Sequence, residues 1–88
     1  MSQNVTLDQR NADYQWLLDD PRGRRVLRHI LLDITGLFRS TFSTNALTMA
    51  NAEGSRYVGL RIQDELISAS RSGYAQVINE HIQEANHG

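Results

Sequence analysis

The sequence predicts an all-α fold of three to four short helices, with an ordered irregular connector between the second and the third. Apolar side chains recur at three- and four-residue steps in several segments, as they do along one face of a helix. The only proline, Pro21, directly follows an aspartate, which is typical of a helix start. The one segment that alternates like a strand has no second strand to pair with.

The 88 residues are enough for one domain. Residues 7–84 are expected to form this single helical domain, with residues 1–6 as a flexible N-terminus and residues 85–88 as a frayed tail. A domain of this size buries only about 60–65% of its extended surface, so its core is small. With 40% hydrophobic residues, the composition is that of a folded protein.

The first two helices are separated by the aspartates that precede Pro21. The first is predicted over residues 8–18 and ends there because the residue before a proline is pushed out of helical geometry. The second is predicted over residues 21–34, with Asp20 as its N-cap and Gly36 as its terminator. Its expected core stripe consists of Val26, Leu27, Ile30, Leu31 and Ile34.

Residues 37–50 are expected to form the connector, because serine, threonine and asparagine favour turns and caps over helix interiors. Phe38 and Phe42 are predicted to anchor this segment by packing. Trp16 is the corresponding aromatic anchor of the first helix. The connector is therefore expected to be ordered although it is irregular.

A third helix is predicted to begin with Asn51 as its cap, and a fourth follows residues 70–73. Gly54 and Gly59 each weaken a helix by about 1 kcal/mol relative to alanine. Two such glycines indicate the close approach of another backbone or a large side chain, so both are candidate packing positions. The alternative is a third helix that begins only near Gly59.

Four arginines lie within residues 22–28, and all nine basic residues of the chain are arginine. Helix N-termini favour acidic side chains, so arginines at this end need an anionic neighbour. Arginine forms bidentate pairs with carboxylates and tolerates partial burial better than lysine, although a GC-rich genome would also enrich it. The neighbour could be an aspartate nearby, an acidic group elsewhere in the chain, another subunit or nucleic acid.

No catalytic, metal or cofactor site is expected, and the protein is not predicted to be an enzyme. The chain has no cysteine, which excludes disulfides and thiolate metal sites. His29, His81 and His87 lie far apart in the sequence and match no metal-ligand spacing. No serine lies in a GxSxG turn, and no glycine-rich phosphate loop is present. No segment approaches the roughly 20 apolar residues that span a bilayer, so no membrane partner is expected.

Two kinds of binding protein fit the sequence. The arginine cluster could contact DNA phosphates, and short helices joined by turns are typical of helix-turn-helix modules. Against this, the net charge is −1 and no second basic helix is available to read base edges. A protein-interaction module accounts for the small core and for arginines that need partners, although a self-contained helical bundle would show the same features.

Four motifs carry a resemblance to a known family. They are Trp16-Leu17; Pro21-x-Gly23-Arg24-Arg25-x-Leu27; Gly36-x-Phe38-x-Ser40-x-Phe42 with Asn45; and Glu53-Gly54-x-Arg56-x-Val58-Gly59-Leu60. Between Trp16 and Leu66 the chain resembles a family of small structural proteins of tailed bacteriophages, of the short-tailed Bordetella-phage type.

The resemblance implies a virion component encoded among head and head–tail genes, found in the virion and in the host cytoplasm during assembly. It implies a homo-oligomer or multi-copy assembly that docks onto portal, head–tail or inner capsid proteins, with packaged DNA as a possible but not specific partner. The alternative is a small phage regulatory protein that binds DNA or a host factor.

The family pattern also suggests a charge network between the second and third helices. Its candidate members are Asp20, Arg24, Arg25, Glu53 and Arg56. Gly54 and Gly59 would then allow the aromatic residues of the connector to pack closely against the third helix. The arginines could alternatively face outward, towards portal, capsid or DNA.

Overall fold

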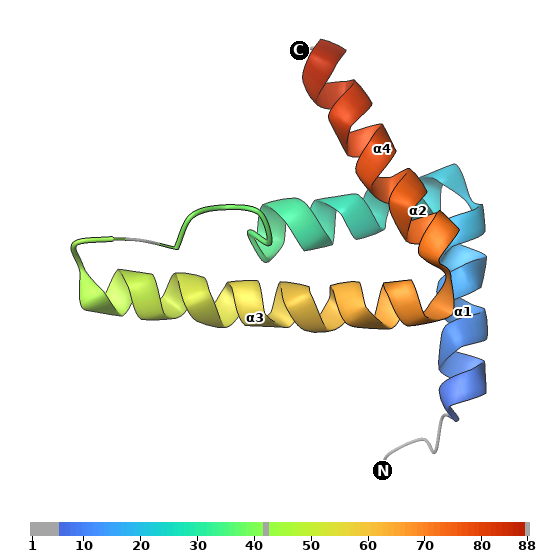
Figure 1. The fold of residues 1–88 in the computed structure, drawn as a ribbon, viewed down its shortest axis with the longest axis horizontal. Coiled ribbons are helices and arrows are strands. Elements are labelled where there is room, and N and C mark those ends of the chain that lie inside the picture. Colours follow the sequence, from blue (N-terminus) through green and yellow to red (C-terminus); the bar gives the residue numbers. More distant parts are fainter. Residues whose placement is uncertain (1–5, 42, 88) are drawn as a thin grey trace.

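The computed structural model describes residues 6–41 and 43–87, and within them it is helical with no strand. The prediction of an all-α fold is confirmed (Figure 1). In chain order the elements are α1 (Leu7–Asp19), α2 (Pro21–Arg28), the π-helix η1 (His29–Ile34), α3 (Ala46–Ala69) and α4 (Arg71–His87).

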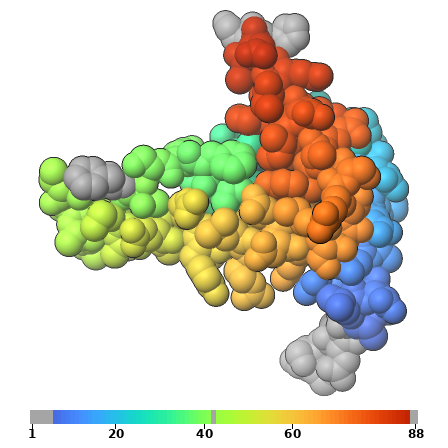
Figure 2. Space-filling model, viewed as in Figure 1, coloured from blue at the N-terminus to red at the C-terminus, as the bar shows by residue number. Residues whose placement is uncertain are grey.

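The helices form a flat, open arrangement. η1 packs beside the middle of α3, while α1 crosses the end of α3 and α4 returns across α2 (Figure 1). The molecule measures 42 × 42 × 19 Å, and its radius of gyration of 14.6 Å exceeds the value of about 12 Å expected for a compact domain of this length. Figure 2 shows two projecting arms, namely the N-terminal half of α3 with the connector and the C-terminal half of α4.

Side-chain caps fix where three of the helices begin. Thr6 and Gln9 form a reciprocal capping box at the start of α1, and the Asp20 carboxylate accepts from the backbone N–H of Arg22 at the start of α2. The Asn45 side chain accepts from the backbone N–H of Thr48. α3 therefore begins at Ala46, so the predictions of a start at Asn51 or near Gly59 are wrong.

The second predicted helix spans residues 21–34 as expected, but it changes winding at residue 29. The Thr35 N–H donates to the Ile30 carbonyl at 3.0 Å, which is the i→i+5 bond of a π-helix. Gly36 ends it with a φ of 65°. In this wider winding the buried residues recur at steps of four, at positions 27, 31 and 35. The predicted core stripe is therefore corrected, because Val26 and Ile34 are exposed.

The core lies where α1, α2, η1, α3 and α4 converge. Its buried members come from every helix and from the start of the connector: Leu18, Leu27, Leu31, Leu32, Leu37, Leu66 and Val77. This core is small, and it leaves the two arms largely without cover.

The predicted termini lie partly outside the described residues. Residues 1–5 and 88 are not described, and Thr6 belongs to the cap of α1. α4 continues through residues 85–87, which the sequence assigned to a frayed tail. Among the helices described, none is long and apolar enough to cross a membrane.

Candidate interaction site

The most deeply placed charges join α2 to α4. Arg24 is 8% exposed, and its Nε donates to both carboxylate oxygens of Glu80 at 3.1 Å. Its Nη1 donates to the Leu18 carbonyl at 2.8 Å, and its Nη2 lies 3.0 Å from Glu80 Oε2. The guanidinium is thus held on two sides, by the end of α1 and by α4.

Arg28 extends this arrangement by one helical turn. Its Nη1 lies 3.3 Å from Glu80 Oε1 and its Nη2 lies 2.7 Å from Glu84 Oε2. We call these four residues, Arg24, Arg28, Glu80 and Glu84, the α2–α4 charge network. The two arginines lie four residues apart on α2, and the two glutamates lie four residues apart on α4. One turn of α2 therefore places two positive charges opposite two negative charges on one turn of α4.

The network has a clear electrostatic signature. The hydrogen bond from Arg24, followed by the positive charges of Arg24 and Arg28, lowers the pKa of Glu80 below its usual range. Glu80 therefore stays ionised against two guanidinium groups that are almost fully buried. Buried charges of this kind are tolerated only when they are paired and hydrogen-bonded.

A surface pocket of about 290 Å³ adjoins the network. Both charge signs are present among its lining residues, which are Pro21, Arg25, Arg28, Glu80, Gln83 and Glu84. Because the glutamates lie beside the arginines, the pocket is not a purely positive site that would bind an anion. In the described part of the chain, no group of three or more histidine and acidic side chains could hold a metal ion.

The structure brings only part of the predicted charge network together. Arg24 pairs with Glu80 on the fourth helix, whereas the expected link was to the third. Asp20 caps α2 and lies 3.7 Å from the exposed Arg22. Arg25 and Glu53 are exposed and form no ion pair within the described residues. The sequence signal that could have found Glu80 is the spacing of Glu80 and Glu84, which equals that of Arg24 and Arg28.

Arg56 holds the connector rather than a carboxylate. Its Nε donates to the Leu37 carbonyl at 3.1 Å, which fixes the start of the connector on α3. Close by, α3 passes Thr35 so tightly that a Cβ atom at Gly59 would overlap Thr35 Oγ1. Gly59 is therefore required for this close approach of α3 to Thr35.

The predicted packing anchors have different surroundings. Trp16 is 71% exposed and Phe38 is 61% exposed, so neither belongs to the core. Phe42 lies outside the described residues. Gly54 has nothing within 4 Å of the position that a Cβ would take, unlike Gly59. Aromatic type alone could not separate a core anchor from a surface residue, because the small core is filled by leucines.

A second polar contact fixes α1 against α3. The Tyr14 hydroxyl donates to Glu65 at 2.7 Å, and Gln15 Nε2 donates to the Ala69 carbonyl at 2.7 Å. Burial, helped by the hydrogen bond to Glu65, raises the pKa of Tyr14 to about 12. The same hydrogen bond lowers the pKa of Glu65. This contact holds the crossing of the two helices, and the sequence did not predict it.

Large apolar side chains are exposed on every helix and on the connector. They are Leu7, Trp16, Val26, Ile34, Phe38, Leu47, Tyr57, Val58 and Ile82. Single exposed apolar residues are ordinary, but several on the two projecting arms leave surfaces suited to other proteins.

Comparison with known proteins adds the family. Residues 14–79 match the model of the Bbp19-like phage protein family. Comparisons with curated proteins and with solved structures gave no match. The matched range includes α2, η1, α3 and the start of α4, but it ends just before Glu80 and Glu84, the carboxylates of the α2–α4 charge network. The chain therefore belongs to the Bbp19-like phage protein family.

Proposed function

We propose that the protein is a non-enzymatic structural component of the virion, present in several copies. It docks helical faces onto larger virion proteins at the portal, the head–tail region or the inner capsid. Membership of a phage protein family supports the viral setting. The observation that carries the docking role is the exposure of large apolar side chains on arms that no other helix covers, such as Ile82 at 50% on α4.

The polar contacts suit such a role because they make the frame rigid. The α2–α4 charge network orients α4, and the bond from Arg56 fixes the connector. Surfaces held in one geometry lose little conformational entropy when they bind. A small core with uncovered helical arms is thus adapted to fill a space between larger subunits.

The experiment is a quantitative mass-spectrometric analysis of purified phage particles. We expect the protein at a constant copy number per particle, and we expect cross-links to portal, head–tail or inner capsid proteins. A phage that carries Ile82→Asp should incorporate less of the protein, while a phage with the exposed control Asn79→Asp on the same helix should incorporate normal amounts. Absence from particles, with abundant protein in infected cells, would contradict the proposal.

The alternative of a regulatory protein that binds DNA has weaker support. Of the four arginines within residues 22–28, Arg24 and Arg28 are occupied by Glu80 and Glu84. Only Arg22 and Arg25 are exposed, and Asp20 lies beside Arg22. Two exposed arginines, one of them paired with Asp20, release few counterions, so we expect duplex DNA binding by this cluster to be weak at physiological salt. Fluorescence anisotropy with labelled duplexes over a salt series measures this directly.

A further inference from the structure

Gly54 is the least explained residue of α3. It lies nine positions inside a 24-residue helix, where glycine costs about 1 kcal/mol relative to alanine. Gly59 has a reason within the chain, since a Cβ there would overlap Thr35, but among the described residues nothing lies within 4 Å of a Cβ placed at Gly54. The surface at Gly54 is therefore open to the close approach of another molecule.

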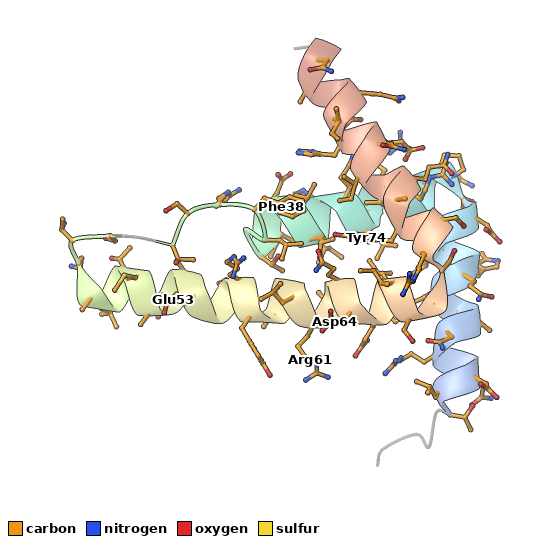
Figure 3. The ribbon with its side chains drawn as sticks, viewed as in Figure 1. Phe38, Glu53, Arg61, Asp64 and Tyr74 are labelled. Atoms are coloured by element: carbon orange, nitrogen blue, oxygen red, sulfur yellow. The ribbon has the colours of Figure 1, made fainter. Side chains whose placement is uncertain are left out.

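Gly54 lies in the middle of an exposed apolar stripe. We call this stripe the outer face of α3, and its members are Leu47, Ala50, Gly54, Tyr57 and Val58. Leu47, Tyr57 and Val58 are 72%, 61% and 50% exposed. Arg61, one turn further along the same side, points away from η1 in Figure 3. The stripe thus faces away from the body of the molecule, on the arm that projects in Figure 1.

The spacing of the stripe is that of a coiled-coil seam. Positions 47, 50, 54 and 57 are separated by three, four and three residues, as a and d positions are. Their sizes read large, small, small, large. This order is the same in both directions, so an identical helix that runs the opposite way fits it layer by layer.

We propose that the outer face of α3 is the seam of an antiparallel homodimer. Leu47 of one copy packs against Tyr57 of the second copy, and Ala50 packs against Gly54 of the second copy, with both layers repeated by the two-fold axis. The small central pair lets the backbones approach closely, which explains the glycine. A two-fold interface of this kind is self-complementary and closed, as in most homodimers.

The flanks of the seam give the dimer a recognisable salt dependence. Asn51 lies on one flank, near Asn51 of the second copy. Glu53 lies on the other, near Glu53 of the second copy, and it has no ion pair within the described residues of its own chain. Because these like charges repel, salt should strengthen the dimer, whereas it weakens an interface that depends on opposite charges. A seam of only four layers is small, so we expect a dissociation constant in the micromolar range.

This inference goes beyond the proposed virion role and needs only the purified protein to test it. Sedimentation equilibrium of the full chain should show a monomer–dimer equilibrium that shifts towards dimer as salt is raised. Gly54→Arg should raise the dissociation constant at least about tenfold. Because nothing in the chain lies near Gly54, this variant should keep its helical circular dichroism. The control Asn79→Arg, exposed on α4, should leave the dimer unchanged, and Glu53→Gln should strengthen it.

Single cysteines test the orientation, since the native chain contains none. With the two-fold axis near position 52, residues 51 of the two copies are adjacent, whereas residues 68 are about 48 Å apart. Asn51→Cys should therefore form a cross-linked dimer with a short bis-maleimide, and Ser68→Cys should not. A monomer at all concentrations, a dimer insensitive to Gly54→Arg, or equal cross-linking at both positions would overturn the proposal.

Discussion

Arg24 and Glu80 are 56 residues apart in the sequence, yet the guanidinium Nε of one donates to both carboxylate oxygens of the other at 3.1 Å. This contact closes the fold, because it ties the second helix to the last. It also accounts for the unusual placement of arginine near a helix N-terminus, since the anionic partner arrives from α4.

The first prediction concerns removal of the shared carboxylate. Glu80→Gln leaves Arg24 and Arg28 buried with less negative charge to balance them, so we expect the free energy of unfolding to fall by about 3 kcal/mol. For a domain of this size that lowers Tm by more than about 10 °C. Glu84→Gln is the control, because this carboxylate is 63% exposed and should cost under about 1 kcal/mol. Equal melting curves would contradict the assignment of Glu80 as the central residue.

A second prediction separates geometry from charge at Arg24. Lysine keeps the positive charge but cannot contact both oxygens of Glu80 and the Leu18 carbonyl together. We therefore expect Arg24→Lys to lower the free energy of unfolding by about 2 kcal/mol. The exposed Arg25 should tolerate the same change within about 0.5 kcal/mol. Thermal melts of the two variants decide the matter, and a stable Arg24→Lys protein would show that charge alone is sufficient.

The third prediction contrasts the two glycines of α3. Gly59→Ala places a methyl group against Thr35 Oγ1 and should destabilise the protein by about 1–3 kcal/mol. Gly54→Ala meets nothing in the chain, so in dilute monomer it should stabilise by up to about 1 kcal/mol. Urea unfolding of both variants measures the difference. Combining Gly59→Ala with Thr35→Ala should recover part of the loss if the threonine causes it.

A fourth prediction concerns acid. The pKa of Glu80 is lowered by Arg24 and that of Glu65 by Tyr14, both from an ordinary value of 4.5. A carboxylate with a lowered pKa in the folded state stabilises the fold above its ordinary pKa. Stability should therefore be level above about pH 5 and fall as the pH drops below 4.5. Tm measured from pH 7 to pH 3 should show this loss, and Glu80→Gln should show a smaller one.

At alkaline pH the prediction rests on Tyr14. Its pKa is raised from 10.0 to about 12, because the buried hydroxyl donates to Glu65. The folded state thus favours the neutral phenol. The stability that this preference adds is fully present below pH 10 and is lost as the pH rises towards 12. Absorbance at 295 nm follows the titration, while Tm follows the stability. Tyr14→Phe should remove this part of the alkaline loss; an unchanged profile would contradict it.

Helix starts that depend on a capping residue within the first turn could be predicted from the sequence. Asp20 and Pro21 place the start of α2 correctly, because a cap depends only on its next three residues. The predicted start of α3 at Asn51 is too late, because serine, threonine and asparagine in residues 40–45 favour a connector that extends to residue 50. Asn45 is in fact a sufficient cap, and tertiary contacts maintain the helix despite two glycines.

The partners of the arginines could not be read from local sequence. Nothing near Arg24 indicates that Glu80 will lie beside it, because the pairing depends on the angle at which α4 returns. The exposure of Val26 and Ile34 was missed for a different reason. Counting at 3.6 residues per turn assigns Ile34 to the core, whereas the π winding turns it outward. Val26 lies before the π segment, and it is exposed because the buried face of α2 runs through Gly23, Arg24, Leu27 and Arg28.

The π winding of η1 also determines how the residues after it are rotated about the helix axis. Each of its hydrogen bonds spans one residue more than an α-helical bond, so the segment stores an extra residue within the same rise. If the same residues followed an α-helical path instead, the extra residue would no longer be absorbed, and the chain beyond would rotate by about 100°. Thr35 would then leave the groove at Gly59, and the Leu37 carbonyl would leave Arg56. The number of residues in this turn, as much as their identity, determines where the connector meets α3.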